Sequence, residues 1–243
     1  MPKILAFLFL ILTPGMGVLA GDLTLSQHLY RDNLSFGYST SNWDYREVST
    51  KSNEQIMKDS GQLSGGTVKY THFGILHSIY FTTELMYLTG NTTYDGQYTS
   101  GKPVSIQTKN SISHLSLGVG KAFDLEGINS VLSFSASIKS RTLNNANSGV
   151  QGDYSRKINY YLLPIQSSLN IITSSGNIIG ISGSYEHFIS GRVDSRLSEA
   201  IQNHPDVVNF QNKGQIWKIE ANYTIVGSDM SFSISPYLKI IKI

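Results

Sequence analysis

The sequence lacks cysteine, so a disulfide scaffold, a lipid-anchored cysteine and a thiolate metal site are all excluded. Charged residues are also scarce, at 15% of 243 residues, compared with about 25% in ordinary soluble domains. The formal net charge of +2 gives no reason to expect nucleic acid as a partner. After residue 20, no apolar run approaches the roughly 18 residues of a spanning helix. What the chain has instead is many tyrosines, phenylalanines and glycines.

The first twenty residues have the three parts of a secretory signal peptide. Lys3 supplies a positive start, residues 4–12 form an apolar core, and small residues precede Gly21. Pro14 and two nearby glycines interrupt the apolar run, which is too short for a membrane anchor. We therefore predict cleavage between Ala20 and Gly21.

Residues 112–140 show the two-residue period of a β-hairpin. Apolar side chains alternate with small or polar ones in two runs, separated by a break at 125–129. The apolar set is Leu115, Leu117, Val119 and Phe123, followed by Leu132, Phe134, Ala136 and Ile138. Each run is apolar on one face over about ten residues, enough for a tilted strand to cross a bilayer.

The same alternation recurs along the chain and predicts nine strands, the first at 34–48 and the ninth around 232–238. Long polar segments are expected as loops at 49–60, 90–109, 141–157 and 191–213, the last with a short helix from Ser195 to Ile201 capped by Asp194. Tight turns are expected near Phe73–Gly74 and at 125–129, 173–177 and 227–229. In an antiparallel meander this alternation places the loops at one end and the turns at the other.

Charged residues indicate which strand face is inside. Six of them lie opposite the apolar set of their own strand: Lys69, Glu84, Lys139, Glu186, Lys218 and Glu220. Lys121, near a strand end, is the exception. An ion facing lipid costs roughly 2 to 4 kcal/mol at the midplane, so the charged face should line the lumen. A narrow barrel is filled by its side chains, and we predict a network of paired charges there rather than a wide pore.

By these features the chain resembles the small outer-membrane β-barrel proteins of Gram-negative bacteria, the group that includes opacity-type and OmpA-like barrels. The first hairpin, with NWDYREV at 42–48 and DSGQLSGG at 59–66, is the most specific part of the likeness. The resemblance implies an all-β, antiparallel up-and-down transmembrane β-barrel of about 8–10 strands over residues 33–243, with a periplasmic lead-in at 21–32. It further implies short periplasmic turns, long extracellular loops, surrounding outer-membrane lipid and lipopolysaccharide, and insertion by the barrel-assembly machinery.

One departure concerns closure. Members of the group usually have an even number of strands and end on an aromatic residue, whereas this chain shows nine strands and ends at Lys242–Ile243. Three explanations are open: the last strand is missing from the chain, Leu23–Leu29 supplies an edge, or the count of nine is one too low.

Three sets of residues resemble catalytic or metal-binding motifs. His114 and Ser116 resemble the His-x-Ser pair of barrel lipid A deacylases, but the nearest downstream glutamate, Glu126, falls in a turn. His204 and Asp206 faintly resemble omptin-type proteases without the second acidic pair. His28, His72, His77 and His187 lack the spacing of a metal site.

We therefore expect no catalytic residue, no cofactor and no metal, and a structural or surface-interaction role whose ligand the sequence does not identify. The alternatives are a narrow porin-like channel, a barrel hydrolase acting on lipid A or peptides, and a soluble exported barrel that holds an apolar ligand.

Overall fold

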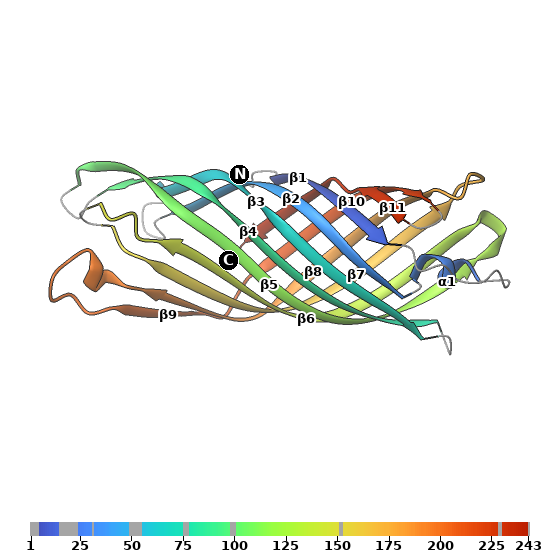
Figure 1. The fold of residues 1–243 in the computed structure, drawn as a ribbon. Coiled ribbons are helices and arrows are strands. Elements are labelled where there is room, and N and C mark those ends of the chain that lie inside the picture. The colour runs from blue at the N-terminus through green and yellow to red at the C-terminus, as the bar shows by residue number, and fades with distance from the viewer. Residues whose placement is uncertain are drawn as a thin grey trace.

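A computed structural model describes residues 5–14, 24–30, 32–48, 55–74, 78–97, 101–150, 153–227 and 230–242. Almost all of these residues are in antiparallel strands (Figure 1). The strands are β1 (Leu5–Pro14), β2 (Asn33–Val48), β3 (Gln55–Gly74), β4 (Ile79–Gln97), β5 (Pro103–Leu125), β6 (Ser130–Ala146), β7 (Arg156–Ile172), β8 (Ile178–Ser195), β9 (Val207–Gln211), β10 (Gln215–Val226), β11 (Met230–Ile234) and β12 (Tyr237–Lys242). The helices are short: α1 (Leu25–Tyr30), η1 (Glu126–Ile128) and η2 (Leu197–Glu199). No helix in the described ranges is long and apolar enough to cross a membrane.

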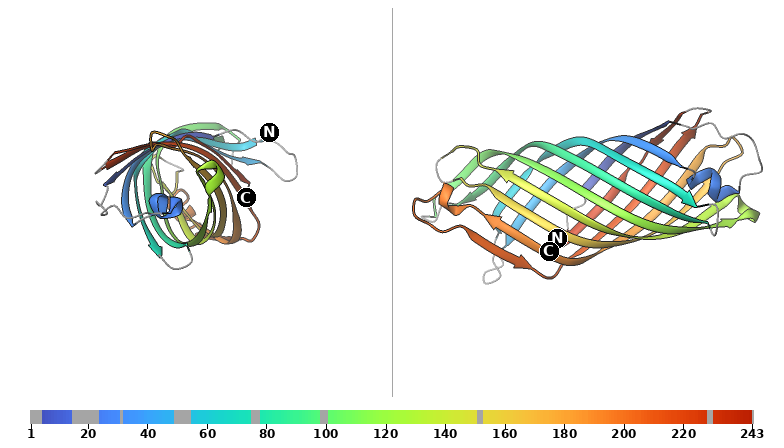
Figure 2. Two further views of the ribbon diagram at one scale, coloured as in Figure 1. Left: turned by 90° about the vertical axis from the view of Figure 1, so that its right-hand side faces the viewer. Right: turned by 60° about the horizontal axis from the view of Figure 1, so that its bottom comes forward.

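The strands close into a ring. Each strand from β1 to β8 pairs with the next, β8 pairs with β10, and β11 and β12 connect β10 back to β1. β9 and β10 follow one another along β8, and β11 and β12 follow one another along β10, so twelve strands minus two give ten positions in the wall. Figure 2 shows the wall as a cylinder whose strands are tilted relative to its long axis. This confirms the predicted antiparallel up-and-down β-barrel.

The wall carries its apolar side chains outward. Phe36, Leu117 and Ile219 are 49%, 46% and 59% exposed, and similar residues recur on every strand from β2 to β8 and on β10. A soluble barrel would hold such side chains inside. An apolar belt around the outside is the arrangement of a transmembrane barrel.

The hairpin predicted at 112–140 is present in full. β5 and β6 pair without interruption from Lys109 opposite Ala146 to Leu125 opposite Ser130, and the chain reverses through η1. β7 begins at Arg156 and β8 at Ile178, close to the predicted strand starts.

The predicted loops are shorter in the structure because the strands continue beyond the apolar belt. β4 runs on to Gln97 and β5 starts at Pro103, so most of the loop expected at 90–109 is strand. Polar side chains on both faces hide the period there, yet they pair across strands, as the Ser105 hydroxyl does with Asp95 at 2.6 Å. The helix expected at 195–201 is only the three-residue η2, and Asp194 belongs to β8 instead of capping it.

The two ends of the barrel differ in their connections. The loop end carries the connections at 49–54, 98–102, 147–155 and 196–206. The turn end carries those at 75–78, 126–129, 173–177 and 227–229.

The tenth wall position is occupied by a segment that the sequence assigned to the signal peptide. β1 lies between β2 on one side and β11 and β12 on the other. The expectation that Leu23–Leu29 might supply an edge is wrong, because Leu25–Tyr30 forms α1. An apolar run of about ten residues suits both a leader and a barrel strand, so length alone did not distinguish them. Ala20 and Gly21 lie outside the described residues, and cleavage between them stays a prediction.

We predict that protein recovered from the outer membrane begins at Gly21, which removes β1 and leaves β2 beside β11 and β12. Unpaired strand edges in lipid cost several kcal/mol per group, so these edges should then pair directly. The natural absence of cysteine lets a Gly37→Cys/Ser233→Cys variant report on this by disulfide formation, because both positions lie across from Ile11 of β1. With β1 between them these positions are about 10 Å apart, beyond the roughly 7 Å that a disulfide spans.

Intact-mass measurement and a non-reducing gel read out both parts of this prediction. Ser133→Cys/Ser168→Cys is the positive control, because these hydroxyls lie 2.7 Å apart on the neighbouring strands β6 and β7. A mass that retains residues 1–20, with no disulfide in the first variant, would make β1 a permanent wall strand.

Candidate functional site

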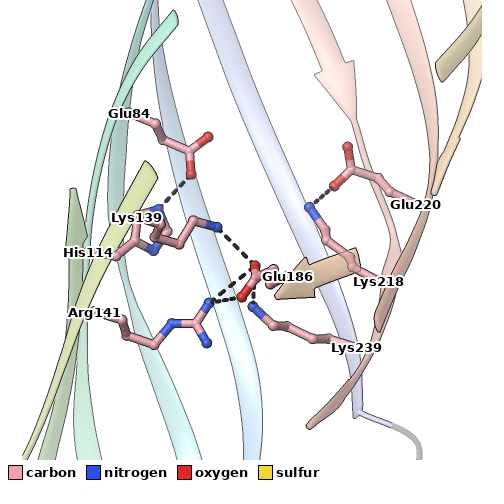
Figure 3. Close-up of polar contacts among 8 residues, drawn as sticks. All are labelled: Glu84, His114, Lys139, Arg141, Glu186, Lys218, Glu220 and Lys239. Carbon is pink, nitrogen blue, oxygen red and sulfur yellow. Dashed lines mark hydrogen bonds and ion pairs between the residues drawn. The ribbon is translucent and has the colours of Figure 1, made fainter. Parts of the chain in front are cut away.

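An ionic layer crosses the middle of the lumen and centres on Glu186 of β8. Glu186 is 2% exposed. Its carboxylate accepts from Nζ of Lys139 at 2.9 Å, from Nη2 of Arg141 at 3.0 Å and from Nζ of Lys239 at 3.1 Å (Figure 3). These cations come from β6 and β12, so one carboxylate joins three strands that are separate in the wall. The cluster ties opposite parts of the wall together across the lumen.

A second contact in this layer joins Glu84 of β4 to His114 of β5. Oε1 of Glu84 lies 2.6 Å from Nε2 of His114, which is buried (Figure 3). Nδ1 of His114 is buried without a hydrogen-bond partner among the described residues. Lys69 lies directly across from Glu84 in the β3–β4 register.

The third contact lies on β10. Nζ of Lys218 is 2.5 Å from Oε2 of Glu220, and it also lies 4.5 Å from the ring centroid of Tyr237. This pair is more exposed than the Glu186 cluster, with side-chain exposures of 30% and 24%.

The structure thus places the six sequence-predicted lumen charges in one layer, five of them in contacts and Lys69 beside Glu84. It also adds Arg141 and Lys239, which sequence reasoning missed. Arg141 fell in a segment taken for a loop, although it continues the two-residue spacing from Lys139. Lys121, the predicted exception, is exposed on the outer face with Nζ 5.3 Å from the Phe123 ring centroid.

Toward the loop end the lumen is filled by two different groups of side chains. An apolar cluster on the β7, β8 and β10 side comprises Ile158, Tyr160, Leu162, Phe188, Val193 and Ile216. On the β3 and β5 side, buried Asp59 accepts from Trp43 Nε1 at 3.1 Å and from Asn110 Nδ2 at 2.7 Å. Side chains therefore occupy the lumen above the ionic layer, as expected for a barrel of this size.

At the turn end, α1 lies within the outline of the ring (Figure 2) and packs against the lumen wall. The Tyr30 ring stacks on Tyr80 at a centroid distance of 4.3 Å, and its hydroxyl donates to Ser133 at 2.7 Å. The backbone N–H of fully buried Ser26 donates to Asp124 at 2.7 Å. These contacts hold α1 as a plug in this mouth of the barrel.

The segment that follows α1 is fastened to the wall by Asp32. Its carboxylate accepts from the backbone N–H of Phe73 at 2.8 Å and contacts Nδ1 of His72 at 2.8 Å. The Phe73 amide and the His72 imidazole hold the pKa of Asp32 below its ordinary value. This contact fixes the entry into β2.

The residues weighed for hydrolysis do not form a linked set. The structure supplies a carboxylate for His114 from Glu84 rather than from Glu126, which lies in η1. Ser116 is two residues from His114 on the same strand, a spacing of about 6.6 Å, and no hydrogen bond between them occurs in the described part of the chain. The candidate base thus has an orienting partner but no nucleophile within reach.

The other candidate residues are engaged locally. Nδ1 of His204 contacts the carbonyl of Pro205, and Asp206 accepts from the hydroxyl and backbone N–H of Ser198, which lower its pKa. His77 lies outside the described residues. No group of three or more metal-ligating side chains occurs among the residues described.

Comparisons with known proteins give matches by structure. No protein-family model and no curated protein matches the chain. Among solved structures, the chain is similar to the β domain of the Bordetella autotransporter BrkA, with 13% identity, a TM-score of 0.38 and 98% coverage of both chains. It is also similar to the outer membrane protease OmpT from Escherichia coli, with 7% identity, a TM-score of 0.35, and coverage of 99% of this chain and 97% of that one. At these identities no residue role passes from either protein to this chain.

Proposed function

We propose that this chain is an outer-membrane β-barrel with a side-chain-filled lumen and a structural or surface-contact role, rather than an enzyme. Lipid and lipopolysaccharide surround its apolar belt, the barrel-assembly machinery inserts it, and the turn end faces the periplasm. The predicted signal peptide and the outward apolar side chains support this location. The loop end then faces the outside of the cell, and it is the part of the barrel that would contact a surface ligand.

The main support for a non-conducting role is that side chains fill the lumen at successive levels along its axis. A plug, an ionic layer and two upper clusters follow one another along the barrel axis. A narrow porin-like channel, the alternative, needs a water-filled path past all of them.

We predict that the purified protein gives no steady unit currents in planar bilayers. Deleting residues 24–30 removes α1 and should raise the frequency of current events, with a preference for anions. The charged layer has five cations against three carboxylates, a balance of +2: Lys69, Lys139, Arg141, Lys218 and Lys239 against Glu84, Glu186 and Glu220. A Ser26→Ala variant loses the side-chain hydrogen bonds of Ser26 with Asp124 and Thr24 but keeps the backbone bond to Asp124, and it serves as a mild control. Stable unit currents from the unaltered protein would contradict the proposal and favour the channel.

The hydrolase alternative has one supporting observation, the contact of 2.6 Å between Glu84 and His114. Both groups face the lumen, whereas a lipid substrate approaches from the outer wall. Mass spectrometry of lipid A from cells that express the protein tests this directly. We expect the acyl pattern to be unchanged; a loss of acyl chains that disappears in His114→Ala would reinstate the hydrolase.

A further inference from the structure

The outer wall over β3 to β6 contains a groove of about 620 Å³. Its floor is formed by small residues, Gly66, Ser113 and Ser140, and its sides by Val68, Leu85 and Leu115. These side chains lie on the outward face, where the three apolar ones are 38%, 52% and 42% exposed. Tyr87 and Thr142 also line it from the outward face, and only Met86 and His114 belong to the lumen face of their strands. The groove therefore opens toward the lipid.

Gly66 is what keeps the groove hollow. A Cβ added there would meet only the carbonyl oxygen of Gly37, at 3.8 Å, so backbone packing does not require glycine. The register of β3 with β2 and β4 is continuous through Gly66, so no bulge explains it either. Glycine inside a strand weakens the strand and often marks close approach of a ligand.

The groove lies at the loop-end margin of the apolar belt. The strand register places Tyr38, Gly66, Tyr87, Ser113 and Thr142 in one row around the wall. The next outward row toward the loop end is polar: Thr40, Ser64, Thr89, Ser111 and Asn144. Tyrosines at such a margin are typical of the membrane interface.

Two exposed lysines lie on the loop-end side of the groove: Lys157 continues this polar row on β7, and Lys109 of β5 lies one outward row further. Lys157 lies across from Asn144, two residues past Thr142 and so about 7 Å further along. Lys109 lies four residues past Ser113, about 13 Å along β5. Asp194 of β8 lies directly across from Lys157, but its carboxylate accepts a hydrogen bond from Nε of Arg192 at 2.8 Å. Both ammonium groups are thus placed above the groove at the height of lipid headgroups.

We propose that this groove binds an acyl chain of a phosphorylated glycolipid of the outer leaflet, with the phosphate held by Lys109 and Lys157. The proposal rests on the outer-membrane orientation given above, since that orientation puts the groove in the outer leaflet. The apolar sides accept the chain, the serines of the floor offer hydroxyls at the interface, and the lysines supply the charge that distinguishes a phosphorylated head from a neutral one.

Native mass spectrometry of the detergent-purified barrel, titrated with lipid A and with dephosphorylated lipid A, tests both halves of the site. Gly66→Leu fills the groove and should weaken binding of both lipids by about tenfold, the loss of one or two buried methylene groups. Lys109→Gln/Lys157→Gln should weaken only the phosphorylated lipid, by on the order of a hundredfold, since two charge-assisted contacts of about 1.5 kcal/mol each are lost.

Matched controls come from the same wall. Gly183 is an exposed outward glycine on β8 with nothing near its added Cβ, so Gly183→Leu should bind both lipids as the unaltered barrel does. Lys121→Gln removes an outward cation at the turn end and should also have no effect. Equal binding by Gly66→Leu and Gly183→Leu, or equal losses for both lipids in the lysine variant, would overturn the inference. Failure of the unaltered chain to enter membranes would overturn the proposed function instead.

Discussion

Replacing Glu186 with leucine is expected to destabilise the barrel by about 3–5 kcal/mol, because three cations lose the buried carboxylate that they share. Unfolding in urea from lipid vesicles, followed by tryptophan fluorescence, gives the change in free energy. The two tryptophans, Trp43 and Trp217, lie on β2 and β10 and so report on two separate strands of the wall, on either side of the closure at β1.

Glu220→Gln is the matched control for this experiment. Its partner Lys218 is partly exposed, and exposed ion pairs contribute about 0–1 kcal/mol. A quadruple change of Glu186, Lys139, Arg141 and Lys239 to leucine or methionine should recover part of the loss, because it removes the carboxylate and its three cations together. A cost below about 1 kcal/mol for Glu186→Leu would mean that water in the lumen solvates these cations well enough without the Glu186 carboxylate.

The second large effect concerns which face meets lipid. Ile138 is 60% exposed in the apolar belt on β6, and Ile138→Lys is expected to cost about 2–4 kcal/mol because an ion near the bilayer midplane is poorly solvated. On the surface of a soluble barrel the same change would fall within about 0.5 kcal/mol of zero. The same vesicle unfolding measurement distinguishes the two cases.

Ser111→Lys provides the comparison, since Ser111 is outward in the polar row beyond the belt. It should be close to neutral. If Ile138→Lys were as mild as Ser111→Lys, the apolar belt would not be covered by lipid, and a soluble exported barrel would account for the chain better.

The barrel could be predicted from the sequence because the alternation of apolar and polar residues that specifies each strand is a local, periodic pattern. The hairpin of β5 and β6, with Leu117 and Ile138 on one face and Lys139 on the other, follows from the two-residue period of a strand with one apolar face. Where both faces are polar that period vanishes, so the sequence predicts a loop from Gly90 to Gln97, although this segment continues β4 and pairs with β5 along its whole length.

For the contacts across the lumen, the sequence predicted which charged side chains face inward but not which of them pair. Alternation predicted that Lys139 and Glu186 face inward. The pairing of Glu186 with Lys239, 53 residues apart in sequence, depends on β12 lying beside β10, which in turn pairs with β8. The plug was missed because Leu25–Tyr30 is a short helix held by distant partners, such as Tyr80 and Ser133, rather than by its own turns. The groove at Gly66 could not be predicted, because the sequence alone does not show which side chains of the neighbouring strands surround this glycine.

Heat-modifiability of the mature chain tests the central claim, a closed barrel inserted in the outer membrane, most directly. The chain is expressed in a Gram-negative host, and the outer-membrane fraction is extracted in detergent and run on a gel with and without boiling. The account predicts that the unboiled protein is in the membrane fraction and migrates differently from the boiled protein, because a closed barrel resists unfolding by the detergent. Identical mobility, with the protein in the periplasm or in aggregates, would contradict it.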